Sequence, residues 1–84
     1  MTLSDWSSLF FARLGEKTKG FAAPSGPDED GHYATKLNGK DLFVMGCDDC
    51  FATVWFEGSP VCDYSNASAT DAKEAALFIA SAAA

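Results

Sequence analysis

The sequence predicts a small α+β domain: a three- to four-stranded antiparallel meander flanked by an N-terminal and a C-terminal helix, in the order α-β-β-β(-β)-α. Apolar residues recur at helical spacing near both ends of the chain. Between them lie short runs rich in aromatic and β-branched residues, separated by glycine-containing turn sequences. With 84 residues, 48% of them hydrophobic, the chain suits a single globular domain that covers residues 1–84.

Residues 3–14 are predicted to form the first helix. Thr2 or Ser4 can cap its N-terminus, and Gly15 is placed to end it. Phe11 points away from the main apolar face, so it either packs under the following segment or is exposed. The apolar face consists of Leu3, Trp6, Leu9, Phe10 and Leu14.

Residues 15–31 have the composition of a flexible linker. The stretch 22–31 contains two prolines, two glycines and three acids, which favour turns over regular structure. A short edge strand at residues 20–23 is an alternative for part of this segment. A loop of this length is unusual in a small domain.

Four strand-like runs follow the linker. Asn38-Gly39 is a strong signal for a two-residue hairpin, because both residues tolerate positive φ. Gly58-Ser59-Pro60 predicts a further turn before the last strand. The predicted strands are residues 32–37, 41–46, 51–57 and 61–64.

Residues 69–83 are predicted to form the second helix, with Ser68 as its N-cap. Small residues on one face would let this helix approach the sheet closely. That face consists of Ala69, Ala72, Ala76, Ile79 and Ala83.

The charge is strongly negative and unevenly distributed. The whole chain carries a formal charge of −6, but residues 1–27 have two acids and three basic residues, whereas residues 28–84 have ten acids and three lysines. The second segment therefore has a net charge of −7. Such a surface disfavours direct contact with nucleic acid and favours a basic protein partner. The chain shows no signal peptide or membrane-length apolar stretch, so we expect a cytoplasmic protein without membrane contact.

The three cysteines do not form an even disulfide framework. Cys47, Cys50, Cys62 and His32 together provide four ligands of the type that zinc prefers, which makes a structural zinc site an alternative. The acids between Cys47 and Cys50 disfavour a redox role. We expect no cofactor. We also expect no enzymatic activity, because no nucleophile–base pair or paired acids occur at motif spacing.

Acidic and aromatic residues form the candidate partner-binding set. One face of the third strand carries Phe51, Thr53 and Trp55, and the other carries Ala52, Val54 and Phe56. Two helices can cover only one face of an open sheet, so one of these sets is expected to face outward, where aromatic side chains can anchor a partner. The predicted partner-binding residues are Asp28, Glu29, Asp30, Asp48, Asp49, Phe51, Trp55, Glu57 and Asp63.

The C-terminal half resembles the double-stranded-RNA-binding domain. The matching features are the strand 51–56, Gly58, Ser68 and a helix in which Ala72, Lys73, Ala75 and Ala76 occur at the family's spacing. The family's paired lysines, which contact phosphates, fall on Ala69 and Thr70. The resemblance therefore implies a shared architecture in a degenerate form that lacks most of the RNA-binding charge.

These observations together predict a small acidic interaction or inhibitor protein, a monomer or homodimer, that binds the basic surface of a nucleic-acid-handling protein. In size and charge it is similar to nucleic-acid mimics of phages and mobile elements, including anti-CRISPR proteins. The alternatives are a degenerate double-stranded-RNA-binding module, used for RNA binding or dimerisation, and a small zinc-stabilised domain.

Overall fold

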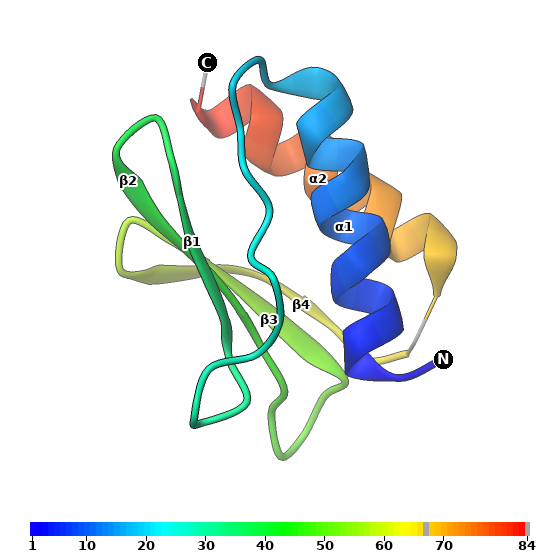
Figure 1. Ribbon diagram of the computed structural model, residues 1–84. Helices are drawn as coiled ribbons and strands as arrows, with labels where there is room; N and C mark the ends of the chain where they lie inside the picture. The colour runs from blue at the N-terminus through cyan, green and yellow to red at the C-terminus, as the bar shows by residue number, and fades with distance from the viewer. Residues whose placement is uncertain (67, 84) are drawn as a thin grey trace.

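Two helices lie on one side of a four-stranded sheet (Figure 1). The computed structural model describes residues 1–66 and 68–83. The strands are antiparallel in the order β1-β2-β3-β4, so the predicted α+β fold with a meander is confirmed. The elements are α1 (Leu3–Lys17), β1 (Tyr33–Leu37), β2 (Lys40–Met45), β3 (Ala52–Phe56), β4 (Ser59–Tyr64) and α2 (Ala69–Ala83).

Two tight turns at the same end of the sheet set the register of the meander. Asn38 and Gly39 have φ values of 53° and 79°, as a type I′ hairpin turn requires. Glu57 and Gly58 have φ values of 55° and 80° and form the β3–β4 turn, so the predicted turn exists but lies at residues 57–58 instead of 58–60. Strand β4 therefore includes Pro60. This proline is tolerated because β4 is an edge strand and its missing N–H breaks no inner ladder.

Helix α1 begins with a capping box and runs beyond its predicted end. Thr2 Oγ1 accepts from the Asp5 N–H at 3.1 Å, and the Asp5 carboxylate accepts from the Thr2 N–H at 3.2 Å. Gly15 does not end the helix, which continues to Lys17. The last turn is supported by the Arg13–Glu16 ion pair at 2.7 Å, and the positive charge of Lys17 suits the helix C-terminus.

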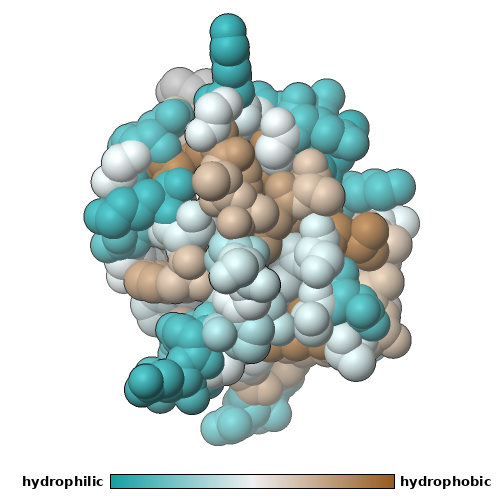
Figure 2. All heavy atoms as spheres, in the orientation of Figure 1, coloured by the Kyte–Doolittle hydropathy of each residue, from teal (hydrophilic) through white to brown (hydrophobic). Residues whose placement is uncertain are grey.

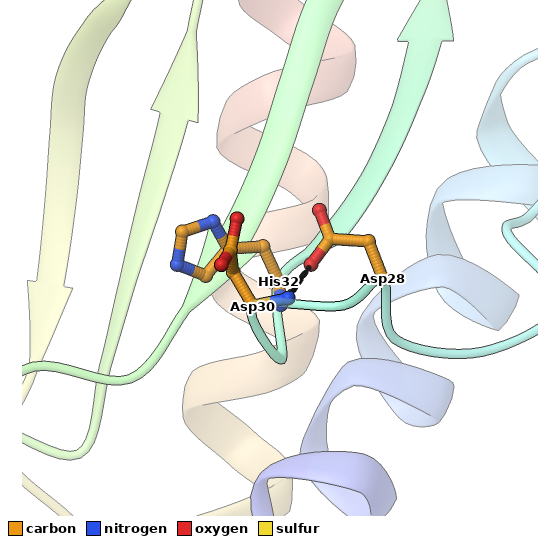
Figure 3. A group of neighbouring side chains, drawn as sticks. All are labelled: Asp28, Asp30 and His32. Atoms are coloured by element: carbon orange, nitrogen blue, oxygen red, sulfur yellow. Dashed lines mark hydrogen bonds between the residues drawn. The ribbon is translucent and has the colours of Figure 1, made fainter.

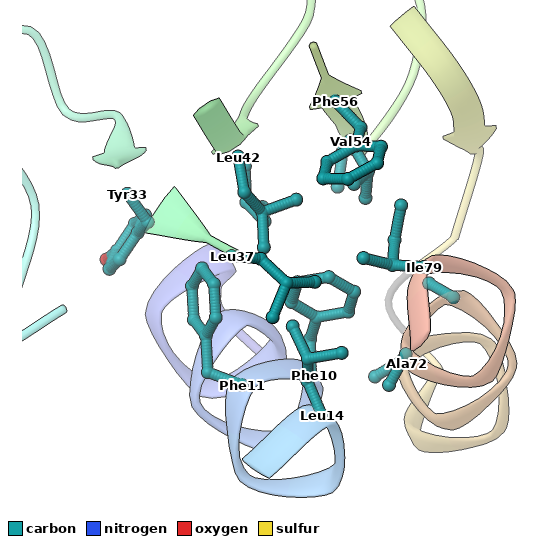
Figure 4. Packing of buried hydrophobic residues seen from close by; sticks show 14 of the residues in the cluster. Phe10, Phe11, Leu14, Tyr33, Leu37, Leu42, Val54, Phe56, Ala72 and Ile79 are labelled. Carbon is teal, nitrogen blue, oxygen red and sulfur yellow. The ribbon is translucent and has the colours of Figure 1, made fainter. Parts of the chain in front are cut away.

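The core lies between the two helices and the inner face of the sheet (Figure 4). Trp6 is fully buried and stacks on Phe10 with 5.7 Å between the ring centroids. Helix α2 comes closest to α1, rather than to the sheet as predicted, and it packs there through small residues. Ala69 is exposed rather than buried, contrary to the prediction for that face, and Ala75 is buried instead. The buried face of α2 consists of Ala72, Ala75, Ala76, Ile79 and Ala83.

The segment between α1 and β1 crosses the molecule beside both elements (Figure 1). Residues 15–17, which were predicted to begin the linker, belong to α1. Residues 20–23 do not form the edge strand that was an alternative for this segment. Phe21 stacks on the buried Phe11 with 6.1 Å between the ring centroids, so Phe11 packs under this linker. Ala22 O accepts a hydrogen bond of 3.1 Å from Thr35 Oγ1, which ties the linker to β1.

Candidate interaction surface

An apolar row crosses the outer face of the sheet from edge to edge. Ala34 pairs with Phe43, Phe43 with Trp55 and Trp55 with Pro60. Directly opposed residues of antiparallel strands point to the same side, so these four side chains form one line. The neighbours of Phe43 and Trp55 along β2 and β3 are buried in the core, which places the row on the face away from the helices. We call Ala34, Phe43, Trp55 and Pro60 the apolar row.

The centre of the apolar row carries a polar group without a partner. Phe43 and Trp55 are half-buried, whereas Ala34 and Pro60 at the edges are exposed. The Trp55 Nε1–H is shielded from solvent and has no acceptor among the residues that the structure describes. Buried indole N–H groups usually find an acceptor, and leaving one unpaired costs roughly 1–3 kcal/mol.

A second, polar row lies beside the apolar row. Met45 pairs with Thr53, and Thr53 pairs with Asp63. Thr53 Oγ1 donates a hydrogen bond of 2.8 Å to Asp63 Oδ1. On its other side, Thr53 Oγ1 lies 3.5 Å from Cys50 Sγ. Asp63 thus places a carboxylate next to the apolar row.

Two acidic loops lie at the end of the sheet nearest this polar row. One loop, residues 28–32, leads into β1, and the other, residues 46–51, connects β2 to β3 (Figure 1). Because β1 and β2 are antiparallel neighbours with Tyr33 opposite Val44, both loops lie at the same end. We call the five exposed acids of these loops the acidic end: Asp28, Glu29, Asp30, Asp48 and Asp49.

The opposite end of the sheet is electrically balanced. Lys36 lies 3.3 Å from Asp41, and Lys40 lies 3.0 Å from Glu57. Glu57 was predicted to contact a partner together with the other acids, but it lies in the β3–β4 turn, away from the acidic end. The unbalanced negative charge of the sheet is therefore concentrated at one end.

Asp28 organises the first acidic loop. Its Oδ1 atom accepts hydrogen bonds of 2.9 Å from the N–H groups of both Asp30 and His32 (Figure 3). The Asp28 N–H donates to His32 O at 2.8 Å, and the Gly31 N–H donates to Asp28 O at 3.0 Å. The His32 N–H, followed by the Asp30 N–H, holds the pKa of the Asp28 carboxyl below its usual range. The loop thus keeps an exposed carboxylate ionised.

One side-chain cluster has ligand types that suit a cation. Ligand atoms of Asp28, Asp30 and His32 all lie within 4.8 Å of one another (Figure 3). Oxygen and imidazole ligands are those that divalent metals use in mixed sites. It is the one group of three such side chains found within residues 1–66 and 68–83, and its two carboxylates are exposed. The sequence did not predict this grouping, because His32 was assigned to a set of cysteines.

The structure does not bring the four residues of the zinc alternative together. The sulfurs of Cys47 and Cys50 are joined in a disulfide, so these two cysteines offer no free thiolates. Cys62 is free and packs against the core, and burial raises the pKa of its thiol. His32 groups with aspartates instead of with cysteines. One disulfide and one free cysteine agree with the odd number of cysteines in the sequence.

The predicted aromatic pair is also separated. Phe51 precedes β3 and packs against the core, where its ring centroid lies 6.3 Å from that of Trp6. Phe51 therefore does not share the open face with Trp55. Phe43 takes its place beside Trp55. The position of Phe43 could have been predicted from the first hairpin. Counting outward from the Asn38-Gly39 turn pairs residue 37 with 40 and therefore residue 34 with 43.

Two further surface features lie away from the open sheet face. On α2, Leu77 is 44% exposed and Phe78 is 51% exposed. A depression of about 250 Å³ lies between α1 and the linker. Figure 2 shows this side of the molecule, with apolar and small residues near its centre and hydrophilic residues around the rim. The depression is lined by Ser4, Ser8, Phe11, Ala12, Ala23, Pro24, Ser25, Gly26 and Tyr33.

No protein-family model matches the chain, and searches of curated proteins and of solved structures find no match either. Neither α1 nor α2, each 15 residues long, is long and apolar enough to cross a membrane, and no other helix within the described residues qualifies. The function is therefore inferred from the geometry of this chain alone.

Proposed function

We propose that this protein is a small, cytoplasmic, non-enzymatic interaction protein that binds a basic surface of a nucleic-acid-handling protein and blocks it. The observation that carries the proposal is the position of the apolar row next to the acidic end. Aromatic side chains at the centre of a patch commonly supply most of the affinity of an interface. Charges at its rim guide the encounter and align the partner.

The charge pattern supports a partner that normally binds nucleic acid. The acidic end and Asp63 lie on one long side of the apolar row. On the other long side, Lys36 and Lys40 of the sheet are paired with Asp41 and Glu57. A basic groove that receives phosphates would attract the acidic end. The half-buried Trp55 ring would then meet the wall of that groove.

An aromatic sheet face can also stack bases of single-stranded nucleic acid, but the charge argues against that use here. Base-stacking surfaces work together with Lys and Arg residues that contact the backbone. Here Lys36 and Lys40 are held in ion pairs, and exposed carboxylates surround the aromatic residues. We therefore favour a protein partner over RNA. The same charges argue against RNA binding by a degenerate double-stranded-RNA-binding-like module.

A competition assay tests the proposal. A fluorescent duplex is bound to each member of a panel of basic nucleic-acid-binding proteins, and this protein is added at low salt. We expect it to displace the duplex from at least one member. Trp55→Ala should weaken that displacement by roughly 30-fold or more, the size typical of an interface hot spot. Asp48→Asn with Asp49→Asn should mainly slow association and reduce its salt dependence.

Phe78→Ala is the matched control, because it removes an exposed aromatic ring from α2, away from the sheet face. It should displace the duplex as well as the unsubstituted protein does. The proposal fails if the unsubstituted protein displaces nothing, or if Trp55→Ala and Phe78→Ala behave alike. Self-association that Trp55→Ala abolishes, without any displacement, would assign the row to a homodimer instead.

A further inference from the structure

We propose that Cys47 and Cys50 form a reversible dithiol–disulfide site in the β2–β3 loop, with Cys47 as the exchanging sulfur and Cys50 as the resolving sulfur. The proposal does not rest on the partner-binding function, although Asp48 and Asp49 take part in both, and it departs from the expectation that these acids disfavour a redox role. It rests on the location of the pair, on the groups around each sulfur and on the charges of the loop.

The location allows the bond to open without unfolding the domain. The two cysteines are three positions apart, so the disulfide closes a very small loop. The stabilisation that a disulfide gives by restricting the unfolded chain decreases as its loop becomes shorter. The β2–β3 ladder ends at the Met45–Thr53 pair, before the loop, and none of its backbone pairs depends on the disulfide. Both cysteines are partly accessible to solvent.

The surroundings of the two sulfurs differ. Cys50 Sγ lies 3.5 Å from Thr53 Oγ1 and 3.7 Å from Ala52 O. The Thr53 hydroxyl already donates its proton to the Asp63 carboxylate at 2.8 Å, so it can only accept from Cys50. Cys50 Sγ is therefore next to two acceptors. No such contact is found for Cys47 Sγ within the part of the chain that the structure describes.

These acceptors favour the protonated, reduced form of Cys50. In the disulfide, Cys50 Sγ has no proton, so neither contact is a hydrogen bond. After reduction, the Cys50 S–H can donate to Thr53 Oγ1 or to Ala52 O. A Cys50 thiolate would instead face two acceptors with the Asp63 carboxylate behind them, which disfavours the anion. Cys47 is consequently the better thiolate and the better nucleophile.

The exchange runs in two balanced steps with a low-molecular-weight thiol, RSH. First, RS⁻ attacks Cys47 Sγ; the bond between the cysteines breaks, and Cys50 leaves as a thiolate that takes up a proton. Second, another RS⁻ attacks the R-bearing sulfur of the mixed disulfide, which releases RSSR and the Cys47 thiolate. The protein disulfide gains two electrons and two protons, and two RSH become one RSSR. Oxidation follows the same steps in reverse.

The loop charge selects among such reagents. Asp48 and Asp49 lie between the two cysteines and are exposed. They repel anionic reagents and attract cationic ones, more strongly at low ionic strength. We therefore expect the site to exchange with neutral or cationic thiols and disulfides in preference to anionic ones such as glutathione.

The first test measures reversibility in a Cys62→Ser background, which removes the third thiol. The protein is treated with dithiothreitol and then with hydroxyethyl disulfide, and free thiols are trapped by alkylation and counted by intact mass. We expect two alkyl groups after reduction and none after oxidation, with an unchanged far-ultraviolet circular dichroism spectrum. A pair that resists reduction under native conditions, or a domain that unfolds on reduction, would overturn the proposal.

The second test compares the two sulfurs one at a time. With cystamine at neutral pH, Cys47 in the Cys50→Ser variant should form the mixed disulfide roughly threefold to tenfold faster than Cys50 in the Cys47→Ser variant. Adding Thr53→Val to the Cys47→Ser variant should speed the reaction of Cys50, because one acceptor is lost. Equal rates at the two sulfurs, or a faster Cys50, would contradict the assignment of roles.

The third comparison separates charge from accessibility. Cystamine should react with Cys47 faster than oxidised glutathione does, and Asp48→Asn with Asp49→Asn should reduce that difference. A preference that these substitutions and added salt leave unchanged would rule out electrostatic selection by the loop.

Discussion

Thr53 Oγ1 donates a hydrogen bond of 2.8 Å to Asp63 Oδ1 across the outer face of β3 and β4. Thr53 is buried, whereas Asp63 is exposed, so an exposed carboxylate satisfies a buried hydroxyl. The same bond fixes the direction of the hydroxyl proton and leaves Thr53 Oγ1 as an acceptor toward Cys50. It thus links the edge strand, the sheet face and the disulfide loop.

Asp63→Ala should destabilise the domain by about 1–2 kcal/mol, because it leaves the Thr53 hydroxyl buried without an acceptor. Thr53→Val removes the donor as well and should cost less once Asp63 is already absent. A double-mutant cycle by urea unfolding is therefore expected to give a coupling energy of about 0.5–1.5 kcal/mol. Strictly additive effects would mean that the hydrogen bond contributes nothing.

Asn38 ties the first hairpin to the end of the second helix. Its Nδ2 atom donates a hydrogen bond of 3.1 Å to Ala83 O, and its backbone φ is 53°. Asn38→Gly keeps the turn conformation but loses the hydrogen bond, at a cost of about 0.5–1.5 kcal/mol. Asn38→Ala should cost about 1–2 kcal/mol more, because an alanine side chain opposes positive φ. Unfolding free energies in urea give the order, and equal stability of the two variants would contradict it.

Close packing of the alanine face of α2 gives the next prediction. Ala76 is fully buried on the face where α2 packs against the rest of the domain. Ala76→Leu should destabilise by roughly 1–3 kcal/mol, because the extra atoms force neighbouring groups apart. Ala82→Leu is the matched control on the exposed side of the same helix and should change stability by less than about 0.5 kcal/mol. Similar losses in both variants would show that the interface is loosely packed.

The elements of this fold were predictable because each has a local signal. These signals act over a few neighbouring residues. They are the capping residues Thr2 and Ser68, the Asn38-Gly39 turn and the run of β-branched and aromatic residues at 52–56. Two boundaries were predicted wrongly. Gly15 lies inside α1, whose exposed last turn is supported by the Arg13–Glu16 ion pair, and Pro60 lies in an edge strand, where a missing N–H is tolerated.

The candidate site was less predictable, because it depends on register and on loop packing. Trp55 and Asp63 lie on the outer face, in adjacent rows. Phe51 instead packs on Trp6, since the chain bends before β3 and takes this residue out of the strand alternation. The convergence of the acids at 28–30 and 48–49 requires knowledge of which loops share an end of the sheet. Spacing along the sequence cannot give that proximity.

The pH dependence of stability should show the role of Asp28 in its loop. The His32 and Asp30 N–H groups lower its folded pKa below the ordinary value of 3.8, so folding favours the carboxylate. This contribution is fully present above the unfolded pKa and is lost as pH falls through the folded pKa. Asp28→Asn keeps the side-chain shape but cannot ionise. The stability advantage of the unsubstituted protein over Asp28→Asn should therefore be largest near neutral pH and shrink on acidification to about pH 2.

Asp30→Asn serves as a control on the same loop, because the Asp30 side chain accepts none of the loop's backbone hydrogen bonds within the described residues. Urea unfolding across the pH range measures both differences, and a constant gap for Asp28→Asn would contradict the assignment.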